Sequence, residues 1–475
     1  MNNAPTPIPW KTDDILEATG GKLLAGSGHG MFQGIGIDSR NIAKKALFVA
    51  IVGDTHDGHT FVNSVLDKGV QGVLVQAEKA GGLATGDLAA KGITVVGVAD
   101  TTRALGDLAA FNRRRTPLKV IALTGSNGKT STRTMLTRIV ENGYATLAPQ
   151  GNFNNEIGLP LTLLRLEKRH TLAVLELGMN RSGEIRRLAD ICRPDIGMIT
   201  NVGPAHLEGL GSIEAILRAK GELLEGLHTN GQTILNADDP HVASLAENAP
   251  GEVLLFGLSD KAAIRAHRVR EKGFRLLFDL EVPGETARVT LATPGRFMVS
   301  NALAAAAAGY LMDIPLSEIT SGLERFQPVE GRMHIRELAN GIFLIDDAYN
   351  ANPASVKAAL DTLKQMGPQR SRIVALGDML ELGEASAALH RDIGRHAALT
   401  APHRLYLFGS FAGDIAQGAL EGGLDKDQII TASLEEITAD LIDRAESRDC
   451  ILVKGSRGMR MERIVKKLIN TFGQR

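Results

Sequence analysis

Short apolar runs alternate with longer segments of helical spacing along most of this chain. The alternation is clearest between residues 100 and 327, where each apolar run leads into a polar loop. Buried strands separated by amphipathic helices predict a doubly wound parallel sheet, whose ligands gather at the carboxyl ends of the strands. A β-rich stretch around 253–291 is expected to add hairpins to that sheet. The strand-like runs are "KVIALT" (119–124), "TLAVLEL" (171–177), "DIGMITNV" (195–202) and "QTILNA" (232–237).

The flanking segments repeat this pattern on a smaller scale. Before residue 100, the runs "ALFVAIV" and "GVLVQ" flank a helical pattern at 60–68. The glycine-rich "GSGHG" at 26–30 follows no clear strand, so we interpret it as a turn and not as a dinucleotide loop. After residue 327, helical segments separate the strand-like runs "GIFLIDD", "SRIVALGD", "RLYLFG" and "CILVKGS".

The length of the chain also favours several domains. A single hydrophobic core stops growing near ~250–300 residues, and this chain has 475. The fold class is therefore α/β, and we place three domains at residues 1–99, 100–327 and 328–475.

Composition narrows the classes of function. A formal net charge of −1 gives no general attraction to nucleic acid or anionic lipid. The basic run Arg113–Arg115 follows a predicted helix at 101–112, and we interpret it as a solvated helix end. Cys192 and Cys450 form no CxxC pair, so neither a disulfide framework nor a thiolate zinc site is indicated. The first residues lack a secretion signal, and the apolar "NALAAAAAGYLM" is too short to span a bilayer. These features favour a cytoplasmic protein without membrane insertion.

The segment "TGSNGKTST" (124–132) lies between a strand-like run and a helical pattern, the setting of a phosphate loop. The common Walker A pattern would require a first glycine at position 123, which is Leu123. The remaining chemistry is present, because Gly125 and Gly128 let the backbone approach an anion at a helix N-terminus. Lys129 can neutralise phosphate charge and the Thr130 hydroxyl can reach Mg²⁺. An ordinary turn is the alternative, and the strand–loop–helix setting favours binding of a nucleoside triphosphate.

Three further polar residues follow the strands of the central segment. Glu176 ends "TLAVLEL" beside the phosphate loop, where it could ligate Mg²⁺ or cap a loop. His206 lies in the turn after "DIGMITNV", and a lone histidine there is more often structural. Lys220 falls in the centre of the apolar stripe of a helix opened by Ser212. Its stem could snorkel to the helix edge, or its amine could be buried with its charge suppressed or paired.

The loop T-G-S-N-G-K-T-S-T resembles the ATP loop of the Mur ligases, which join amino acids or peptides to UDP-N-acetylmuramoyl precursors of the bacterial cell wall. The resemblance covers most of the chain. "GIDSR" and "LFVAIVGDTHDGHTFV" resemble the UDP-binding domain of this family. "GNFNNEIGLPLTLLRL", "LELGMNRSGEI", "NVGPAHLEGLGS" and "RAKGELLEGL" resemble its central ATPase domain. "GRMHI", "DDAYNANPASVKAAL", "LGDMLELGE" and "VKGSRGMRMERIV" resemble its Rossmann-like C-terminal domain.

Two of these strings, "DDAYNANP" and "KGSRGMRME", are similar to the branch that adds D-Ala-D-Ala to a UDP-N-acetylmuramoyl-tripeptide. The DNPR segment typical of the branch that adds meso-diaminopimelate is absent from the sequence. The resemblance implies that ATP phosphorylates the terminal carboxylate of the tripeptide and that the amine of D-Ala-D-Ala then attacks the acyl phosphate. It also implies a cytoplasmic enzyme that uses ATP and Mg²⁺, and we expect a monomer.

The same resemblance assigns roles to individual residues. Catalysis falls to Lys129, Lys220, His206 and Arg332. ATP would be bound by Gly125, Ser126, Asn127, Gly128, Lys129, Thr130, Ser131, Asn301, Arg332 and Asp347. Magnesium would be held by Thr130, Glu176, His206 and Lys220, with Lys220 carbamylated. The UDP part would meet Ser39 and Arg40, the tripeptide Asn154, Asn155 and Glu156, and the dipeptide carboxylate Lys454 and Arg457.

Structural explanations also exist for several of these residues. Asn301 could simply cap the alanine-rich helix that it opens, and Arg332 could form a salt bridge at a domain hinge. Asn352-Pro353 is a good helix start.

Two other functions compete with this interpretation. One is a related ligase, either of another Mur branch or of the folylpolyglutamate synthase type. The other is a P-loop switch without ligation chemistry, although the guanine-reading NKxD string of GTPases does not occur in this chain. The third residue of the tripeptide, lysine or meso-diaminopimelate, stays open.

Overall fold

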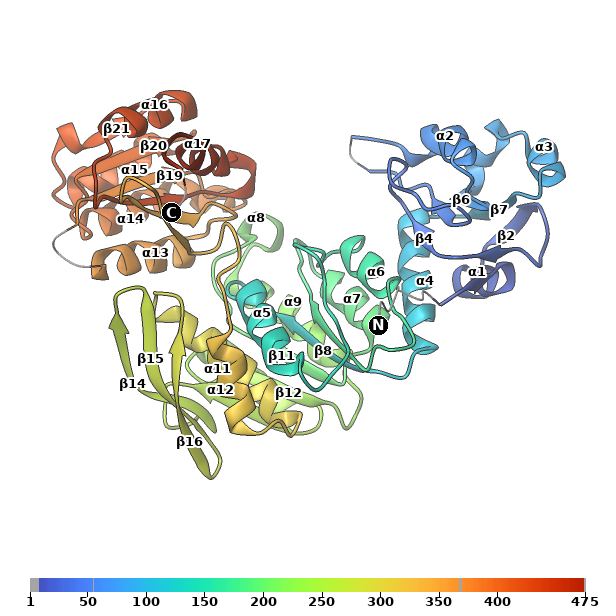
Figure 1. Cartoon of the computed structure of the whole chain (residues 1–475), viewed down its shortest axis with the longest axis horizontal. Coiled ribbons are helices and arrows are strands. Elements are labelled where there is room, and N and C mark those ends of the chain that lie inside the picture. The colour runs from blue at the N-terminus through green and yellow to red at the C-terminus, as the bar shows by residue number, and fades with distance from the viewer. Residues whose placement is uncertain (1–7, 54, 367–369, 474–475) are drawn as a thin grey trace.

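The computed structural model describes residues 8–53, 55–366 and 370–473. Three large sheets follow one another along the chain, and Figure 1 shows them as three successive bodies from blue to red. The blue N-terminal body lies at one end and the red C-terminal body at the other, with the central sheet between them. The expectation of an α/β fold is confirmed.

The N-terminal body contains a five-stranded sheet in the order β2-β7-β6-β5-β4. A two-stranded antiparallel sheet, β1 with β3, accompanies it. The "GSGHG" segment precedes β3 as a turn, as predicted. The strands are Trp10–Lys11 (β1), Lys22–Ala25 (β2), Met31–Phe32 (β3), Ile35–Gly36 (β4), Leu47–Val49 (β5), Gly72–Gln76 (β6) and Thr94–Val98 (β7), and the α-helices are Thr12–Thr19 (α1), Val62–Asp67 (α2) and Thr85–Ala90 (α3).

The central sheet has nine strands in the order β16-β15-β14-β13-β12-β11-β8-β10-β9. Strands β8 to β14 pair in parallel, whereas β14, β15 and β16 form the expected antiparallel hairpins. The strands are Lys119–Thr124 (β8), Thr146–Leu147 (β9), Leu172–Glu176 (β10), Ile196–Ile199 (β11), Gln232–Asn236 (β12), Val253–Gly257 (β13), Ile264–Lys272 (β14), Arg275–Val282 (β15) and Glu285–Leu291 (β16). The helices are Thr101–Arg114 (α4), Lys129–Val140 (α5), Gly158–Leu163 (α6), Glu184–Cys192 (α7), Leu207–Leu210 (α8), Ile213–Glu225 (α9), Pro240–Ser244 (α10), Phe297–Leu311 (α11) and Leu316–Glu324 (α12).

The C-terminal sheet has six strands in the order β17-β18-β22-β19-β20-β21, of which only β17 runs antiparallel to its neighbour. Helices cover both of its faces (Figure 1). The strands are His334–Glu337 (β17), Phe343–Asp347 (β18), Arg372–Gly377 (β19), Arg404–Phe408 (β20), Ile429–Thr431 (β21) and Cys450–Lys454 (β22), and the helices are Pro353–Gln365 (α13), Ser386–Ala398 (α14), Ala412–Glu421 (α15), Leu434–Arg444 (α16) and Glu462–Phe472 (α17).

Helix α4 joins the first two bodies, because it packs against α1 on one side and against α6 and α7 on the other. The interpretation of Arg113–Arg115 as a solvated helix end is wrong for two of the three residues. Arg113 bonds the carbonyl oxygen of Cys192, and the Arg115 guanidinium lies 4.0 Å from the ring centre of Trp10. These arginines fasten the helix to its neighbours. The domain boundaries between residues 99 and 100 and between residues 327 and 328 remain predictions.

No helix in the described ranges is both long and apolar enough to cross a membrane.

Candidate active site

A cavity of about 680 Å³ lies between the central and C-terminal bodies. The central sheet contributes loops at the carboxyl ends of its parallel strands, where ligands of such sheets bind. Most of the predicted site residues line this one cavity. They are Ser126, Asn127, Gly128, Lys129, Ser131, Asn154, Asn155, Glu176, His206, Lys220, Asn301, Arg332, Asp347, Lys454 and Arg457.

The phosphate loop connects β8 with α5, as predicted. Gly125 has a φ of 152° and Gly128 a φ of 80°, a region that favours glycine. Gly128 also has no room for a side chain, since a Cβ atom there would lie 2.1 Å from Oδ1 of Asn301. The Lys129 ammonium donates a hydrogen bond to the carbonyl oxygen of Gly125 at 2.6 Å. The amides at the start of α5 are therefore presented to the cavity beside a lysine that a phosphate group can recruit.

Asn301 contacts this loop from the middle of a helix. Helix α11 already begins at Phe297, so the interpretation of Asn301 as a helix cap is wrong. The side chain is 5% exposed, and its amide nitrogen lies 3.4 Å from the sulfur of Met298. The start of α11 has no side-chain cap, so the local sequence carries no strong signal that the helix begins at Phe297.

Glu176 is placed beside the loop by the parallel pairing of β10 with β8. Its carboxylate accepts hydrogen bonds from the hydroxyl of Thr130 (3.0 Å) and the amide of Asn154 (2.9 Å). The guanidinium of Arg133 lies 3.5 Å from the same carboxylate. Glu176 is only 1% exposed, so a buried oxygen pair faces the start of α5.

Lys220 lies in α9, whose first turn is capped by the hydroxyl of Ser212 as predicted. Its side chain is 2% exposed, which favours the buried amine over a snorkelling stem. Burial, reinforced by the positive charge of nearby Lys129, lowers the pKa of the Lys220 amine well below its ordinary value. Burial also lowers the pKa of Lys129, although the charge of Glu176 opposes that shift.

His206 reaches across to the C-terminal body. Its Nδ1 lies 2.6 Å from Oε2 of Glu381, and the amide of Glu208 donates to the carbonyl of Glu381 at 3.0 Å. Both His206 (φ 59°) and Glu381 (φ 64°) have left-handed backbone conformations, which are uncommon for residues other than glycine. Hydrogen bonding to His206 lowers the pKa of the Glu381 carboxyl.

Arg332 enters the cavity from the C-terminal body. Its guanidinium lies 4.2 Å from the ring centre of Tyr349, and that of Arg457 lies 5.4 Å from the same ring. The backbone around Arg332 is fixed by the strand end of β18. The amide of Gly331 donates to Asp346, and the amide of Met333 donates to Asp347.

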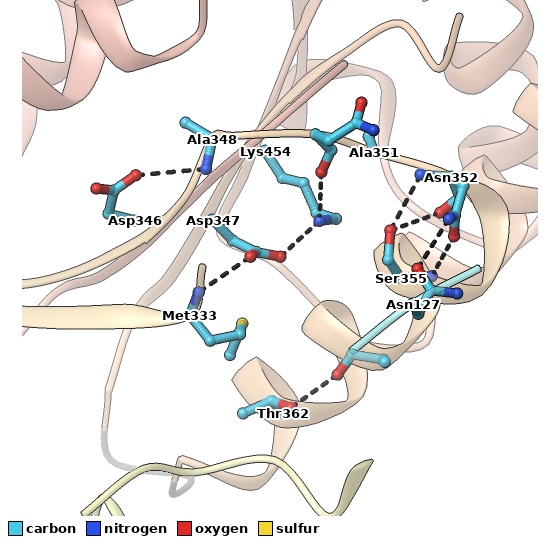
Figure 2. Close-up of polar contacts among 12 residues, drawn as sticks. Asn127, Met333, Asp346, Asp347, Ala348, Ala351, Asn352, Ser355, Thr362 and Lys454 are labelled. Carbon is cyan, nitrogen blue, oxygen red and sulfur yellow. Dashed lines mark hydrogen bonds and ion pairs between the residues drawn. The ribbon is translucent and has the colours of Figure 1, made fainter. Parts of the chain in front are cut away.

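Asp347 and Lys454 form a buried ion pair at 2.6 Å (Figure 2). The Lys454 ammonium also donates to the carbonyl oxygen of Asn350 at 2.9 Å. Burial raises the pKa of the Asp347 carboxyl even though Lys454 opposes that shift. The ammonium predicted to hold the dipeptide is thus already bound within the domain, whereas the Arg457 side chain is 64% exposed.

Some predicted residues lie outside the cavity wall. Ser39 and Arg40 belong to the N-terminal body, where Arg40 pairs with Asp38. Glu156 is exposed beside the wall, and Gly125 and Thr130 act from within the loop.

The wall contains further polar residues that were not predicted as site residues, among them three that contact predicted site residues. Tyr349, Asn352 and Glu381 occur in strings used for the family resemblance, but nothing in the local pattern indicated their long-range partners.

The donor set around Thr130 fits Mg²⁺. Within the described parts of the chain, no three His, Cys, Asp or Glu side chains gather as a complete metal site. Magnesium usually needs only one or two carboxylates, together with phosphate oxygens and water. The buried carboxylate of Glu176 and the hydroxyl of Thr130, next to a phosphate loop, satisfy that requirement.

Three family models match the chain. Residues 31–113 match the Mur ligase family catalytic domain, residues 123–309 the Mur ligase middle domain, and residues 331–457 the Mur ligase glutamate ligase domain.

Curated relatives are similar over almost the whole chain. The UDP-N-acetylmuramoyl-tripeptide--D-alanyl-D-alanine ligase of Haemophilus influenzae is 34% identical over 97% of this chain and 98% of its own length. The enzyme of the same name from Escherichia coli is 36% identical over 91% of this chain and 92% of its own length.

Solved structures agree with these matches. MurF from Acinetobacter baumannii superposes with a TM-score of 0.88 at 32% identity, covering 98% of this chain and 100% of that one. MurF from Thermotoga maritima in complex with ADP gives a TM-score of 0.81 at 26% identity, covering 92% and 97%. The three-domain architecture of these structures is that of the present chain. With these similarities over nearly its full length and a phosphate loop at the domain junction, the chain belongs to the Mur ligase family.

Proposed function

We propose that this chain is an ATP-dependent ligase that adds D-Ala-D-Ala to a UDP-N-acetylmuramoyl-tripeptide in the cytoplasmic synthesis of peptidoglycan precursors. Two of the curated relatives named UDP-N-acetylmuramoyl-tripeptide--D-alanyl-D-alanine ligase are 34% and 36% identical over more than nine tenths of the chain. The observation that carries the proposal is one cavity lined by Lys129 and Glu176 of the central body and by Arg332 of the C-terminal body.

The first step transfers the γ-phosphoryl group of ATP to the terminal carboxylate of the tripeptide, giving an acyl phosphate and ADP. Two anions must meet, so cationic groups have to compensate their repulsion. Lys129 leaves the carbonyl of Gly125 and binds the outer phosphates, while the amides of Gly128 to Ser131 at the start of α5 hold the phosphate chain. Arg332 faces the γ-phosphate from the other wall of the cavity.

Thr130 and Glu176 would hold Mg²⁺, and His206 and a carbamylated Lys220 would hold a second ion. These ions would supply positive charge for the phosphoryl groups. Carbamylation fits Lys220 because a buried amine with a lowered pKa is neutral and nucleophilic, and the carbamate gives it an anionic oxygen pair.

The second step joins the two substrates. The free amine of D-Ala-D-Ala attacks the acyl phosphate carbonyl, phosphate leaves, and an amide bond forms. The exposed guanidinium of Arg457 is available for the dipeptide carboxylate, whereas Lys454 holds Asp347. Asn154, Asn155 and Glu156 would face the tripeptide, Ser39 and Arg40 the UDP part, and Asn301 and Asp347 the nucleoside. The enzyme is proposed to work as a monomer, because two domains of one chain complete the cavity.

The decisive experiment measures ADP formation with a panel of UDP-muramoyl peptides, each with and without D-Ala-D-Ala. We expect ADP only when a UDP-muramoyl-tripeptide and D-Ala-D-Ala are both present, with the amide product confirmed by mass spectrometry. The lysine and meso-diaminopimelate tripeptides are compared in the same panel.

A control variant, Lys129→Ala, should lower kcat by about 10²–10³ without changing Tm, because the ammonium meets charge that develops during phosphoryl transfer. Equal turnover with a single amino acid in place of the dipeptide would exclude the proposed branch.

A further inference from the structure

One hydrogen bond links the C-terminal body directly to the phosphate loop. The side-chain amide of Asn352 donates to Oδ1 of Asn127 at 2.8 Å (Figure 2). The two residues are 225 positions apart in the chain. Both line the cavity, so the bond lies where the two walls meet.

The orientation of the Asn352 amide is fixed by its own helix. Asn352 is the N-cap of α13, and its Oδ1 accepts a hydrogen bond from the amide of Ser355 at 2.9 Å. Because this oxygen faces the helix, the NH₂ group of the same side chain is left to face Asn127. The helix cap therefore aims a hydrogen-bond donor at the phosphate loop.

The backbone of Asn127 is also held in place. Its amide donates to Oδ1 of Asn201 at 2.8 Å, and its carbonyl oxygen accepts from the hydroxyl of Thr200 at 2.7 Å. The next residue, Gly128, is confined by Asn301. The bond from Asn352 therefore reaches a side chain whose backbone is fixed within the phosphate loop.

Asn352 and Arg332 belong to one rigid unit. The amide of Tyr349 donates to the carbonyl of Gly331, next to Arg332, at 3.1 Å. The Lys454 ammonium ties Asp347 to the carbonyl of Asn350. Placing Asn352 on the loop therefore places Arg332 in the cavity at the same time.

We propose that Asn352 is a positioning residue that couples the phosphate loop to closure of the C-terminal domain, and thereby brings Arg332 to the phosphates. The coupling of Asn352 to domain closure is inferred from the contacts of Asn352, Asn127 and Tyr349, whereas its consequence for phosphoryl transfer rests on the proposed function. Coupling between two sites is reciprocal. If domain closure raises the affinity of the loop for nucleotide by some factor, bound nucleotide raises the closed-to-open ratio by the same factor.

Asn352→Ser isolates the contact. Serine caps helices about as well as asparagine, so α13 keeps its first turn, but its short side chain cannot reach Asn127. The matched control is Ser433→Ala, which removes the cap of α16 in the same domain, away from the cavity.

Both native cysteines are buried, so spin labels can be attached at Lys261→Cys and Lys426→Cys, two exposed positions on the central and C-terminal bodies.

With ADP alone, we expect the closed-to-open ratio measured between the labels to fall about 3- to 10-fold in Asn352→Ser, the worth of one hydrogen bond. The Kd for ADP should rise by no more than the same factor. The kcat of ligation should fall with the closed fraction, while the KM for D-Ala-D-Ala stays within twofold. Ser433→Ala should lower Tm and leave the label distances unchanged.

An unchanged closed fraction in Asn352→Ser, or an equal loss in Ser433→Ala, would overturn the inference. Because the closure measurement uses ADP without the other substrates, it is independent of the ligation assay. A parent enzyme that closes through Asn352 but forms no amide would contradict the proposed function and leave the inference standing.

Discussion

Two lysines lie buried on opposite walls of the cavity, Lys220 in α9 and Lys454 at the end of β22. Each is 2% exposed. Lys454 has a carboxylate partner, Asp347, at 2.6 Å and a backbone carbonyl at 2.9 Å. Among the residues that the structure describes, none forms an ion pair with Lys220, and the nearby charge of Lys129 is of the same sign.

The difference separates a structural role from a chemical one. The Lys454 ammonium uses two of its three donors, one on a carboxylate and one on a carbonyl, and so holds the ends of two strands together. A buried amine without a counter-charge is driven to the neutral form, in which its lone pair is free to react. Equal burial thus gives opposite functions, and the partner decides which one.

The largest effect on stability should follow Lys454→Met. Removing one partner of a buried ion pair leaves an uncompensated charge and costs about 3–5 kcal/mol. Urea unfolding should show this loss, and Lys454→Met combined with Asp347→Asn should recover part of it. Since burial raises the pKa of Asp347, the orphaned carboxyl can take up a proton, so the loss should be smaller at pH 5 than at pH 8. A loss below 1 kcal/mol at pH 8 would show that the pair is not structural.

Lys220→Ala should show the opposite profile. We expect activity to fall by about 10² or more, in line with the loss of a preorganised charged group, while the fold is kept. A short carboxylate added to the assay should restore part of the activity of Lys220→Ala, because it can replace the carbamate. Lys220→Arg keeps a positive charge and should not respond. Two results would contradict a chemical role for Lys220: an intact mass of the active enzyme that shows Lys220 unmodified, or full activity of Lys220→Ala.

The same two residues show what sequence can predict. The burial of Lys220 is predictable because its apolar stripe is a local repeat within one helix, and the start of α9 carries a cap signal at Ser212. The Asp347–Lys454 pair joins β18 and β22, which lie 107 positions apart, and no local pattern encodes that register. The phosphate loop, the position of Glu176 at the end of a strand and the order of strands and helices belong to the first class. The Asn127–Asn352 and His206–Glu381 contacts belong to the second, since they depend on how two domains meet.

Arg332 extends the comparison to a cation held by an aromatic ring. Tyr349→Leu removes the ring beneath the guanidinium and should weaken binding of a nonhydrolysable ATP analogue about tenfold, which is about 1.4 kcal/mol and lies between the values of an exposed and a desolvated cation–π contact. Binding of ADP, which lacks the γ-phosphate, should change less than twofold. Tyr349→Phe keeps the ring and serves as the control. Equal losses for both nucleotides would indicate a general packing defect at Tyr349.

The smallest effect concerns His390, a buried ring in α14 that accepts a hydrogen bond from the amide of Met379 at 2.9 Å. Burial lowers the pKa of His390 below its ordinary value of 6.5, so the folded state favours the neutral ring. Its contribution to stability is complete above pH 6.5 and is lost as the pH falls below that value. His390→Gln should reduce the loss of unfolding free energy between pH 6.5 and lower pH. Each pH unit by which the folded pKa of His390 lies below 6.5 corresponds to roughly 1.4 kcal/mol of that loss. Parallel curves for the parent and the variant would show that His390 does not titrate on unfolding.

The cavity wall is divided between two domains, and this has a consequence for inhibition. A molecule that fits only the phosphate loop competes with ATP and leaves the C-terminal domain free to move. A molecule that touches both the loop and the Arg332–Tyr349 wall would hold the domains together as a staple, and its residence time would follow the rate at which they separate. Slow release, more than tight competition, would then distinguish compounds that use the junction.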